Sequence, residues 1–418
     1  MVLSLYSLFV LLCVIAAYSS YFNLRFLGLP KAIGLTALSA FISLSLLVLI
    51  KLEPNLFSPV YDMLDSVNFE TLVLKVLLGY LLFASAMHLD FSKIREFSLA
   101  IVVLSSLGVV ISAFIIGTLC WLMAPLVIGV DINYVHCLMV GAVLSPTDPV
   151  TVFAVFKSTK AVPEKVKAIL SGEAMFNDVF SIVLFLILLS IITHSNQNVG
   201  INEFVFMLLK EGTGGIALGV ILGFIGARLM SNSDDTHTLI IMSLAIVSVG
   251  SWLATRIEVS EPLAMVVCGI VIGNSKSRGR VSEESKKSLS DFWAIVDELL
   301  NTFLFVLIGI VALKMTFSYN VIMAGAILFI MVLVARYLSV IFSMFLVDWS
   351  IQNQFWKNSF VITWAGLRGG VSIALALTIP IEYRNDHASS IVYIAVLLSI
   401  FIQGISFRKV LEKAYAKK

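Results

Sequence analysis

Long apolar stretches separated by short polar segments run along the whole chain. A membrane-spanning α-helix needs about 20 mostly apolar residues, and stretches of that size recur throughout. The pattern predicts an all-α polytopic membrane protein with thirteen transmembrane helices. The predicted spans cover residues 3–20, 30–50, 70–89, 97–126, 134–156, 165–193, 204–229, 236–254, 259–273, 291–313, 320–348, 357–380 and 388–407.

The thirteen spans predict two inverted six-helix repeats joined by a linker helix at residues 204–230. Span 5 is interrupted by Ser-Pro-Thr-Asp-Pro at 145–149, and its counterpart, span 12, by Gly-Leu-Arg-Gly-Gly at 366–370. Pro lacks an N–H and Gly weakens a helix, so both sequences favour a break. Single Pro and Gly residues are common in membrane helices. A matched pair of broken, crossing helices in inverted halves instead indicates the binding site of a secondary transporter.

Composition agrees with a chain that lies almost entirely in the membrane. It is 59% hydrophobic and 13% charged, with a mean hydropathy of +1.01, whereas an ordinary soluble domain is about 25% charged. No polar block is long enough for a soluble nucleotide-binding domain. The four cysteines lie in apolar runs and are interpreted as core residues. The first Lys or Arg is Arg25, so the first apolar stretch is expected to be a retained span rather than a signal peptide.

The distribution of positive charge predicts the orientation. Of the 28 Lys and Arg residues, twenty fall on one side of the predicted membrane. Four lie on the outer side (Lys51, Arg256, Lys314 and Arg384). The remaining four lie within or at the edge of spans (Lys75, Lys210, Arg336 and Arg368). The positive-inside rule then places the N-terminus outside and the C-terminus in the cytoplasm.

Two neighbouring spans carry acids inside apolar sequence. Span 6 contains Glu173, Asn177 and Asp178 within its first turns, and the interruption of span 5 contains Asp148 between two prolines. A charged residue at the centre of a membrane helix costs about 2.5–3.5 kcal/mol on insertion scales. Acids in this position therefore indicate an ion or proton site.

Helical geometry separates the polar residues of span 6 into two faces. Glu173 and Asn177 are four residues apart and share one face, whereas Asp178 points about 140° away from Glu173. Residues on the Asp178 stripe are small or hydroxylic: Ser171, Ala174 and Ser181. Burial disfavours the charged form of a carboxylate, so that a proton and a cation can compete for it. Asp178 is the best candidate for the alternating carrier, the alternative being an acid with a purely structural role.

The other charged residues have more than one interpretation. Asp148 either neutralises the positive ends of half-helices or serves only as a helix cap. Glu173 needs a cationic partner, and Arg336 in span 11 is the strongest mid-span candidate, as an architectural pair. Arg368 either balances Asp148 or lines the cytoplasmic entrance. The chain has no P-loop, no nucleophile constellation, no metal-ligand spacing and no nucleic-acid signature, so neither an enzyme nor a cofactor is expected.

Three blocks of sequence resemble a known family. LSPTDPVTVFAVFK, VPEKVKAILSGEAMFNDVFSIV and WAGLRGGVSIALAL occur in this order, and they resemble the NhaP-type sodium/proton antiporters of the cation:proton antiporter-1 family, relatives of the eukaryotic sodium/proton exchangers. The resemblance implies a homodimer in the cell membrane with a role in pH homeostasis. It implies an interface subdomain (1–96 and 236–315), a core ion-transport subdomain (97–194 and 320–410) and elevator-type exchange.

The resemblance also implies roles for individual residues. Na⁺ would bind at Asp178, Asp148 and Thr147, with Asn177 beside them. Asn177 before Asp178, in place of two aspartates, is the pattern of electroneutral members that exchange one cation for one proton. It further assigns Glu173 and Arg336 to a stabilising ion pair.

Two positions depart from the family pattern. Ala84 stands where many bacterial relatives have Glu, and Ala174 where archaeal members often have Ser. Ion ligation would therefore depend more on Asp178, Thr147, backbone carbonyls and water.

Four functions are compatible with these features to different degrees. Electroneutral Na⁺/H⁺ exchange is the leading hypothesis, and K⁺/H⁺ exchange by the same mechanism is its nearest rival, because both cations use hard oxygen ligands. A cation channel would need a continuous pore and usually a symmetric filter, which the sequence does not show. A sodium-coupled carrier of organic solutes would need recognition groups beyond acids and small residues.

Overall fold

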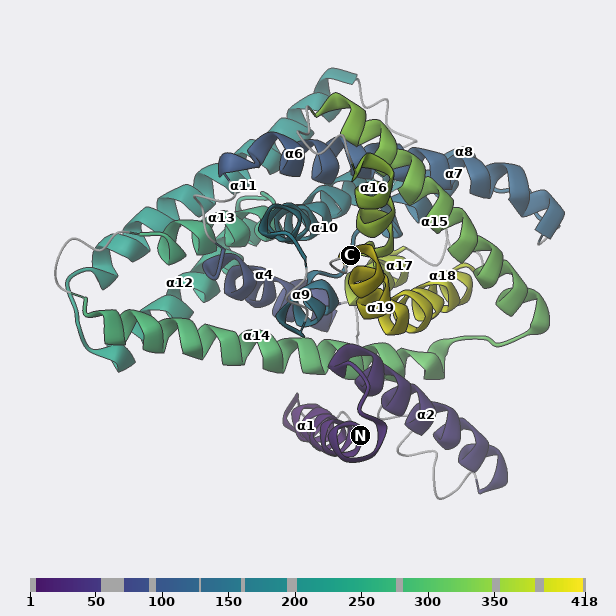
Figure 1. Ribbon diagram of the computed structural model, residues 1–418, viewed down its shortest axis with the longest axis horizontal. Coiled ribbons are helices and arrows are strands. Elements are labelled where there is room, and N and C mark those ends of the chain that lie inside the picture. The colour runs from purple at the N-terminus through teal and green to yellow at the C-terminus, as the bar shows by residue number, and fades with distance from the viewer. Residues whose placement is uncertain are drawn as a thin grey trace. The chain divides into compact units, whose positions relative to one another are not determined.

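The computed structural model describes residues 5–53, 71–89, 95–127, 129–158, 162–193, 201–275, 281–347, 354–379 and 387–415. Regular secondary structure within these ranges is entirely helical (Figure 1). Part of the charge sorting depends on residues outside them (Lys93, Lys160, Lys276, Arg278, Arg280, Arg384, Lys417 and Lys418). One predicted end of each of four spans, the first, third, eleventh and twelfth, also lies outside (Leu3, Glu70, Asp348 and Pro380).

The chain forms two compact units. The first comprises Met1–Val73, Leu99–Ser181 and Asn301–Lys418, and the second comprises Leu74–Ser98 and Ile182–Leu300. Two long helices, α10 (Glu164–Thr193) and α14 (Glu283–Val311), pass from one unit into the other.

The first unit holds the predicted ion site. Besides parts of α10 and α14 it contains α1 (Leu5–Phe22), α2 (Lys31–Leu52), α7 (Gly108–Val127), α8 (Tyr134–Val143), α9 (Pro149–Ser158), α15 (Tyr319–Leu346), α16 (Phe355–Trp364), α17 (Gly370–Thr378), α18 (Ala388–Leu398) and α19 (Gly404–Tyr415). Short π-helical turns precede or join several of these: η1 (Asn23–Leu27), η3 (Val103–Leu107) and η7 (Ser399–Gln403).

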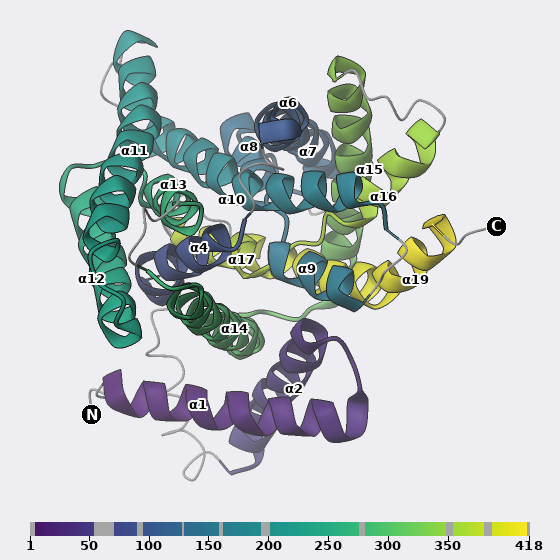
Figure 2. The ribbon, with the colours of Figure 1, turned by 60° about the vertical axis from the view of Figure 1, so that its left-hand side comes forward.

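The second unit holds α4 (Leu78–Met87), α11 (Ile201–Met230), α12 (Thr236–Arg256) and α13 (Glu261–Gly273). Figure 2 shows α4 beside α13. The two helices approach closely at Gly269 and Gly273, which face the backbone of Phe83 and Met87. Ala84 is buried in the apolar core of this unit, in a cluster with Phe83 and Trp293.

Nine helices of the described chain are long and apolar enough to cross a membrane. Shorter apolar helices add to them, at Leu72–Met87, Tyr134–Val143 and Glu261–Gly273. The protein is therefore a multi-pass membrane protein, as the composition predicted.

Side-chain caps set the start of several helices. Asn133 accepts the N–H of Val135 at 3.0 Å before α8, and Asp235 accepts the N–H of Thr238 at 2.8 Å before α12. These oxygens satisfy N–H groups that have no partner inside the helix.

Glycines allow α7 and α8 to pack backbone against backbone. A Cβ at Gly117 would lie 2.8 Å from Cα of Leu138, and Gly141 lies directly against the carbonyl of Ala113. Small residues permit such close approach between membrane helices, where packing rather than the hydrophobic effect drives association. The pair holds α8, and the non-helical residues that follow it, at a defined position in the first unit.

Candidate functional site

Two non-helical segments meet in the first unit. Residues 145–148 lie between α8 and α9, and residues 366–369 lie between α16 and α17. The N–H of Asp148 donates to the carbonyl of Leu367 at 2.7 Å and joins them directly. Irregular backbone inside a membrane protein needs such partners, because lipid offers none.

Gly369 lies against Asp148 at this contact. A Cβ at position 369 would lie 3.0 Å from Cβ of Asp148 and 3.3 Å from its Cγ. The hydrogen atom of glycine leaves room for the two segments, whereas a methyl group would require Asp148 to shift by a few tenths of an ångström.

Arg368 binds the backbone just beyond the C-terminal end of α8. Its Nη1 donates to the carbonyls of Ser145 at 2.6 Å and Pro146 at 2.9 Å, and its side chain is buried. A cation is favourable at a helix C-terminus, where carbonyls lack partners. The sequence left open whether Arg368 balances Asp148 or lines an entrance. The structure shows a third role, in which Arg368 satisfies two carbonyls of the non-helical segment after α8.

Asp148 caps the helix that follows it. Its Oδ2 accepts hydrogen bonds from the backbone N–H of Thr151 at 3.4 Å and from the Thr151 hydroxyl at 2.5 Å. A carboxylate at a helix N-terminus satisfies a free N–H and interacts well with the helix dipole. The cap interpretation thus describes part of what Asp148 does, and its carboxylate remains close to the non-helical segments.

A chain of hydrogen bonds connects Thr147 to Arg336 through α10. Asn177 Nδ2 donates to Thr147 Oγ1 at 3.2 Å and to Glu173 Oε1 at 2.9 Å. Arg336 Nη2, on α15, donates to the same Glu173 Oε1 at 2.8 Å. The Glu173 and Arg336 side chains are 1% and 2% exposed, so this ion pair lies entirely within the protein.

The amide of Asn177 has a fixed orientation because Nδ2 makes two hydrogen bonds. Its Oδ1 is buried and accepts no hydrogen bond in the described part of the chain. Each buried polar atom of this kind calls for an explanation. A bound cation with oxygen ligands would provide one.

Asp178 lies on α10 apart from this chain of hydrogen bonds. Its side chain is 5% exposed, and it makes no hydrogen bond to any residue that the structure describes. The Asp178 carboxylate interacts electrostatically with the charges of Asp148, Glu173 and Arg368. One turn further along, the Ser181 hydroxyl donates to the carbonyl of Ala142 and ties α10 to α8 at this level.

Asp178, Asp148, Thr147 and Asn177 thus all lie buried in the first unit, and Asn177 Nδ2 contacts Thr147 Oγ1. Glu173 is matched by Arg336 at 2.8 Å and contributes no net charge. Within the described ranges no group of three His, Cys, Asp or Glu residues suits a tightly held metal ion.

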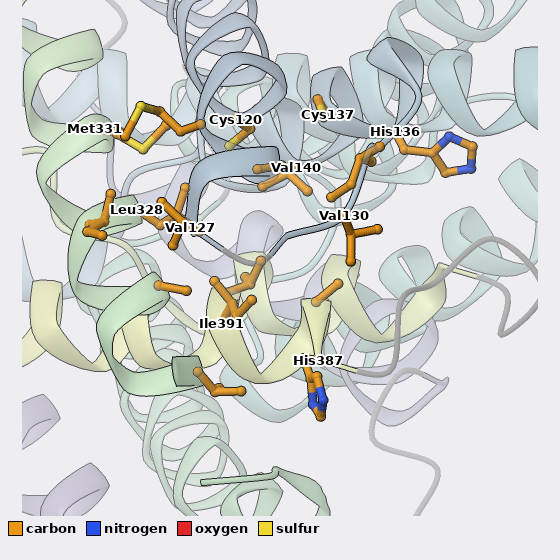
Figure 3. Close-up of a pocket in the computed structure, with 18 of the residues that line it drawn as sticks. Cys120, Val127, Val130, His136, Cys137, Val140, Leu328, Met331, His387 and Ile391 are labelled. Carbon is orange, nitrogen blue, oxygen red and sulfur yellow. The ribbon is translucent and has the colours of Figure 1, made fainter. Parts of the chain in front are cut away.

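A separate cavity of about 520 Å³ lies in the first unit among α7, α8, α15 and α18 (Figure 3). Its wall is mainly apolar, with Val127, Val140, Leu328 and Ile391 among the residues that line it. None of the predicted site residues contributes to the lining.

Two residues that hold the second non-helical segment in place were not predicted from the sequence. Ser399 and Gln403 are buried in η7, and Ser399 Oγ accepts the N–H of Arg368. Their signal in the sequence was weak. They are two polar residues four apart in a mostly apolar span that also contains Ser389, Ser390 and Ser406.

Acids, a hydroxyl and an amide buried inside a multi-pass helical protein are typical of membrane transporters of ions, and fold and site together define this class. The family model described as "Sodium/hydrogen exchanger, transmembrane" matches residues 10–413. The chain belongs to this family, which consists of transporters and not enzymes, and the resemblance to NhaP-type antiporters is confirmed.

Relatives and solved structures agree with this assignment. The chain is 35% identical over 401 residues to the Na⁺/H⁺ antiporter NhaP of Pseudomonas aeruginosa, covering 95% of this chain and 94% of that protein. It is 31% identical over 353 residues to the Na⁺/H⁺ antiporter NhaH of Halobacillus aidingensis, covering 82% and 83%. The structure of the antiporter MjNhaP1 from Methanocaldococcus jannaschii at pH 8 matches with a TM-score of 0.68 and 19% identity, over 92% of this chain and 99% of that chain. This last likeness shows the fold.

Proposed function

We propose that this protein is a secondary active transporter that exchanges Na⁺ for H⁺ across the cell membrane. The observation that carries the proposal is Asp178, a buried acid with no hydrogen bond to the described residues, on the same helix as Asn177, whose amide contacts Thr147. Family membership and the names of the relatives support Na⁺ as the cation.

Asp178 serves as the alternating carrier. Burial penalises its charged form unless a cation neutralises it, so either Na⁺ or a proton must accompany the carboxylate in the protein. Glu173 is neutralised by Arg336, and Asn177 has no proton to exchange. One carrier carboxylate exchanges one charge for one charge, and the exchange is electroneutral.

Na⁺ binds in this proposal to Asp178, Asp148 and Thr147, with Oδ1 of Asn177 available beside them. Ala174 is buried on α10 and supplies no oxygen, and Ala84 lies in the apolar core of the second unit. A site with few side-chain oxygens must be completed by backbone carbonyls or water. This favours K⁺/H⁺ exchange as the second candidate function, because water is a poor discriminator of cation size.

The proposal includes thirteen spans in two inverted halves, with the N-terminus outside and the C-terminus in the cytoplasm. The non-helical segments 145–148 and 366–369 would be the breaks of spans 5 and 12, and the shorter helices on either side of them their halves. The proposed transporter is a homodimer. Its core subdomain (97–194 and 320–410) moves relative to an interface subdomain (1–96 and 236–315) in an elevator mechanism. Because α1 and α2 belong to the same compact unit as the site, their place in the interface subdomain depends on the family resemblance.

The test is flux in proteoliposomes with an imposed Na⁺ or K⁺ gradient, with internal pH as the readout and the membrane potential clamped or free. Wild-type protein should move protons against the cation gradient without net current. Asp178→Asn should abolish exchange while the protein still inserts and dimerises. Asp291→Asn, at an exposed acid of α14, is the matched control and should be fully active.

Each alternative has its own result. Proton movement driven by K⁺ but not by Na⁺ would establish the second candidate. Voltage-driven net current would indicate a channel or an electrogenic carrier. Exchange retained in Asp178→Asn would remove Asp178 from the carrier role, and no coupled proton movement with either cation would overturn the antiporter proposal.

A further inference from the structure

A π-helical turn interrupts the last long helix at the level of the site. η7 (Ser399–Gln403) lies between α18 and α19, and Figure 1 shows these helices gathered with α16 and α17. Single π-turns inside α-helices are rare and occur frequently at functional sites. Ser399 and Gln403 are fully buried in this turn, where an apolar side chain would meet no desolvation cost.

Ser399 makes two hydrogen bonds with one hydroxyl. Its Oγ accepts the backbone N–H of Arg368 at 2.9 Å and donates to Gln403 Oε1 at 2.6 Å. The first bond satisfies an amide in the non-helical segment, and the second fixes the direction of the hydroxyl.

Gln403 extends the same connection. Its Nε2 donates to the carbonyl of Trp364 at 3.3 Å, at the C-terminal end of α16. The neighbouring Gly404 leaves room for two side chains, since a Cβ there would lie 2.9 Å from Cδ1 of Ile33 and 3.3 Å from Cδ2 of Leu367. η7 thus contacts the backbone at Trp364, two residues before the non-helical segment, and at Arg368 within it.

The opposite side of the segment contacts the site itself. The carbonyl of Leu367 accepts the N–H of Asp148, and the Arg368 guanidinium holds the carbonyls of Ser145 and Pro146. Displacement of the Arg368 backbone would move its guanidinium and alter the support of residues 145–148, where Thr147 and Asp148 lie. η7 is therefore mechanically connected to the oxygens of the proposed cation site.

We propose that Ser399 and Gln403 are positioning residues, which set the affinity of the transporter for its cation by clamping residues 364–368 against the segment that carries Thr147 and Asp148. The inference rests on the proposed function for its transport readout. Neither side chain is assigned a contact with the cation.

The chain offers a closely matched control. Ser390 lies on α18, is also buried, and its Oγ accepts the backbone N–H of Thr316 at 3.0 Å. Ser390→Ala therefore removes the same kind of hydrogen bond from the same span, away from residues 364–368. A purely structural role predicts the same outcome for Ser390→Ala and Ser399→Ala.

The experiment measures KM and Vmax for the cation in proteoliposomes, with Na⁺, K⁺ and Li⁺ in separate arms. The variants are Ser399→Ala, Gln403→Met, the double variant and Ser390→Ala. Loss of one buried hydrogen bond typically corresponds to a change of about five-fold in an equilibrium constant. We expect each site variant to raise KM about five-fold with Vmax within about two-fold of wild type. The increase in KM of the double variant should not exceed the product of the two single increases, because both residues act through one chain of hydrogen bonds. Ser399→Thr, which keeps the hydroxyl, should restore KM.

Amide hydrogen exchange of the purified protein provides a second readout that does not depend on transport. Peptides covering 145–148 and 365–369 should lose protection in Ser399→Ala and keep it in Ser390→Ala. Equal KM values in Ser399→Ala, Gln403→Met and Ser390→Ala would overturn the positioning role, whatever the amide hydrogen exchange shows. If wild-type protein transports none of the three cations, the proposed function fails. In that case amide protection alone tests whether Ser399 and Gln403 position residues 364–368. Unchanged protection in Ser399→Ala would overturn that role.

Discussion

Replacement of Arg336 by methionine would leave the Glu173 carboxylate inside the protein without its ion-pair partner. The two side chains are 2% and 1% exposed, and their bond is 2.8 Å long. Glu173 would keep its hydrogen bond from Asn177 Nδ2 at 2.9 Å, which does not compensate a full charge. Removing one partner of a buried ion pair typically costs about 3–5 kcal/mol. We expect a loss of stability in this range.

The double variant Glu173→Gln/Arg336→Met separates the charge from the architecture. It removes both charges, and neutral replacements of buried ion pairs are often no less stable than the pair. We expect it to recover at least half of the stability lost in Arg336→Met. The exposed pair Arg408–Glu412, four residues apart on α19, supplies the control. Arg408→Met should cost less than about 1 kcal/mol.

Thermal unfolding in detergent, followed by the fraction of protein that remains monodisperse, measures these differences. Roughly 2–4 °C of midpoint corresponds to 1 kcal/mol in domains of 150–250 residues, and less in larger proteins. An Arg336→Met protein with the midpoint of wild type would refute the reasoning. So would one that is folded and stable but inactive, because the pair would then act in transport and not in architecture.

Two further predictions concern other parts of the chain. Gly369→Ala should reduce exchange in the flux assay, because its Cβ would lie 3.0 Å from Cβ of Asp148. Gly212→Ala, in open space on α11, is the control and should leave flux unchanged. Equal activities of the two variants would show that the close approach at Gly369 is not needed. The hydrogen bonds from the hydroxyl and backbone of Thr238 lower the pKa of Asp235, which lies before α12, below its ordinary 3.8. A lowered folded pKa stabilises the protein above 3.8, and this contribution is lost as the pH falls through the folded value. Asp235→Ala should therefore lower stability at neutral pH by a margin that shrinks as the pH falls below 3.8, and a margin that does not change with pH would contradict the assigned cap.

The two faces of α10 illustrate how far helical spacing reaches. Residues 173 and 177 lie on one face because four residues make slightly more than one turn, and the structure places both on the Arg336 side. Asp178, one residue further, falls outside that network for the same reason. This separation needed no knowledge of the rest of the fold.

Arg368 illustrates the opposite case. Its partners are backbone carbonyls 223 and 222 positions away in sequence. Every residue has a backbone carbonyl, so the pattern of side chains does not indicate which carbonyls Arg368 binds. The clamp from Ser399 and Gln403 is equally hidden, since it joins two side chains to the backbone of residues 364–368, 31–39 positions away.

By itself the sequence determined that this is a helical membrane protein of the sodium/hydrogen exchanger family and that Asp148, Glu173 and Asp178 lie in two neighbouring apolar segments. Hydrophobic length and helical period are local properties, and a buried charge is conspicuous wherever it occurs. Only the tertiary structure decided that the freed carbonyls are held by Arg368, that Asp148 caps α9, and that η7 supports the second segment. These contacts satisfy backbone groups that irregular turns leave without partners, and which distant atom satisfies each of them depends on how the helices pack.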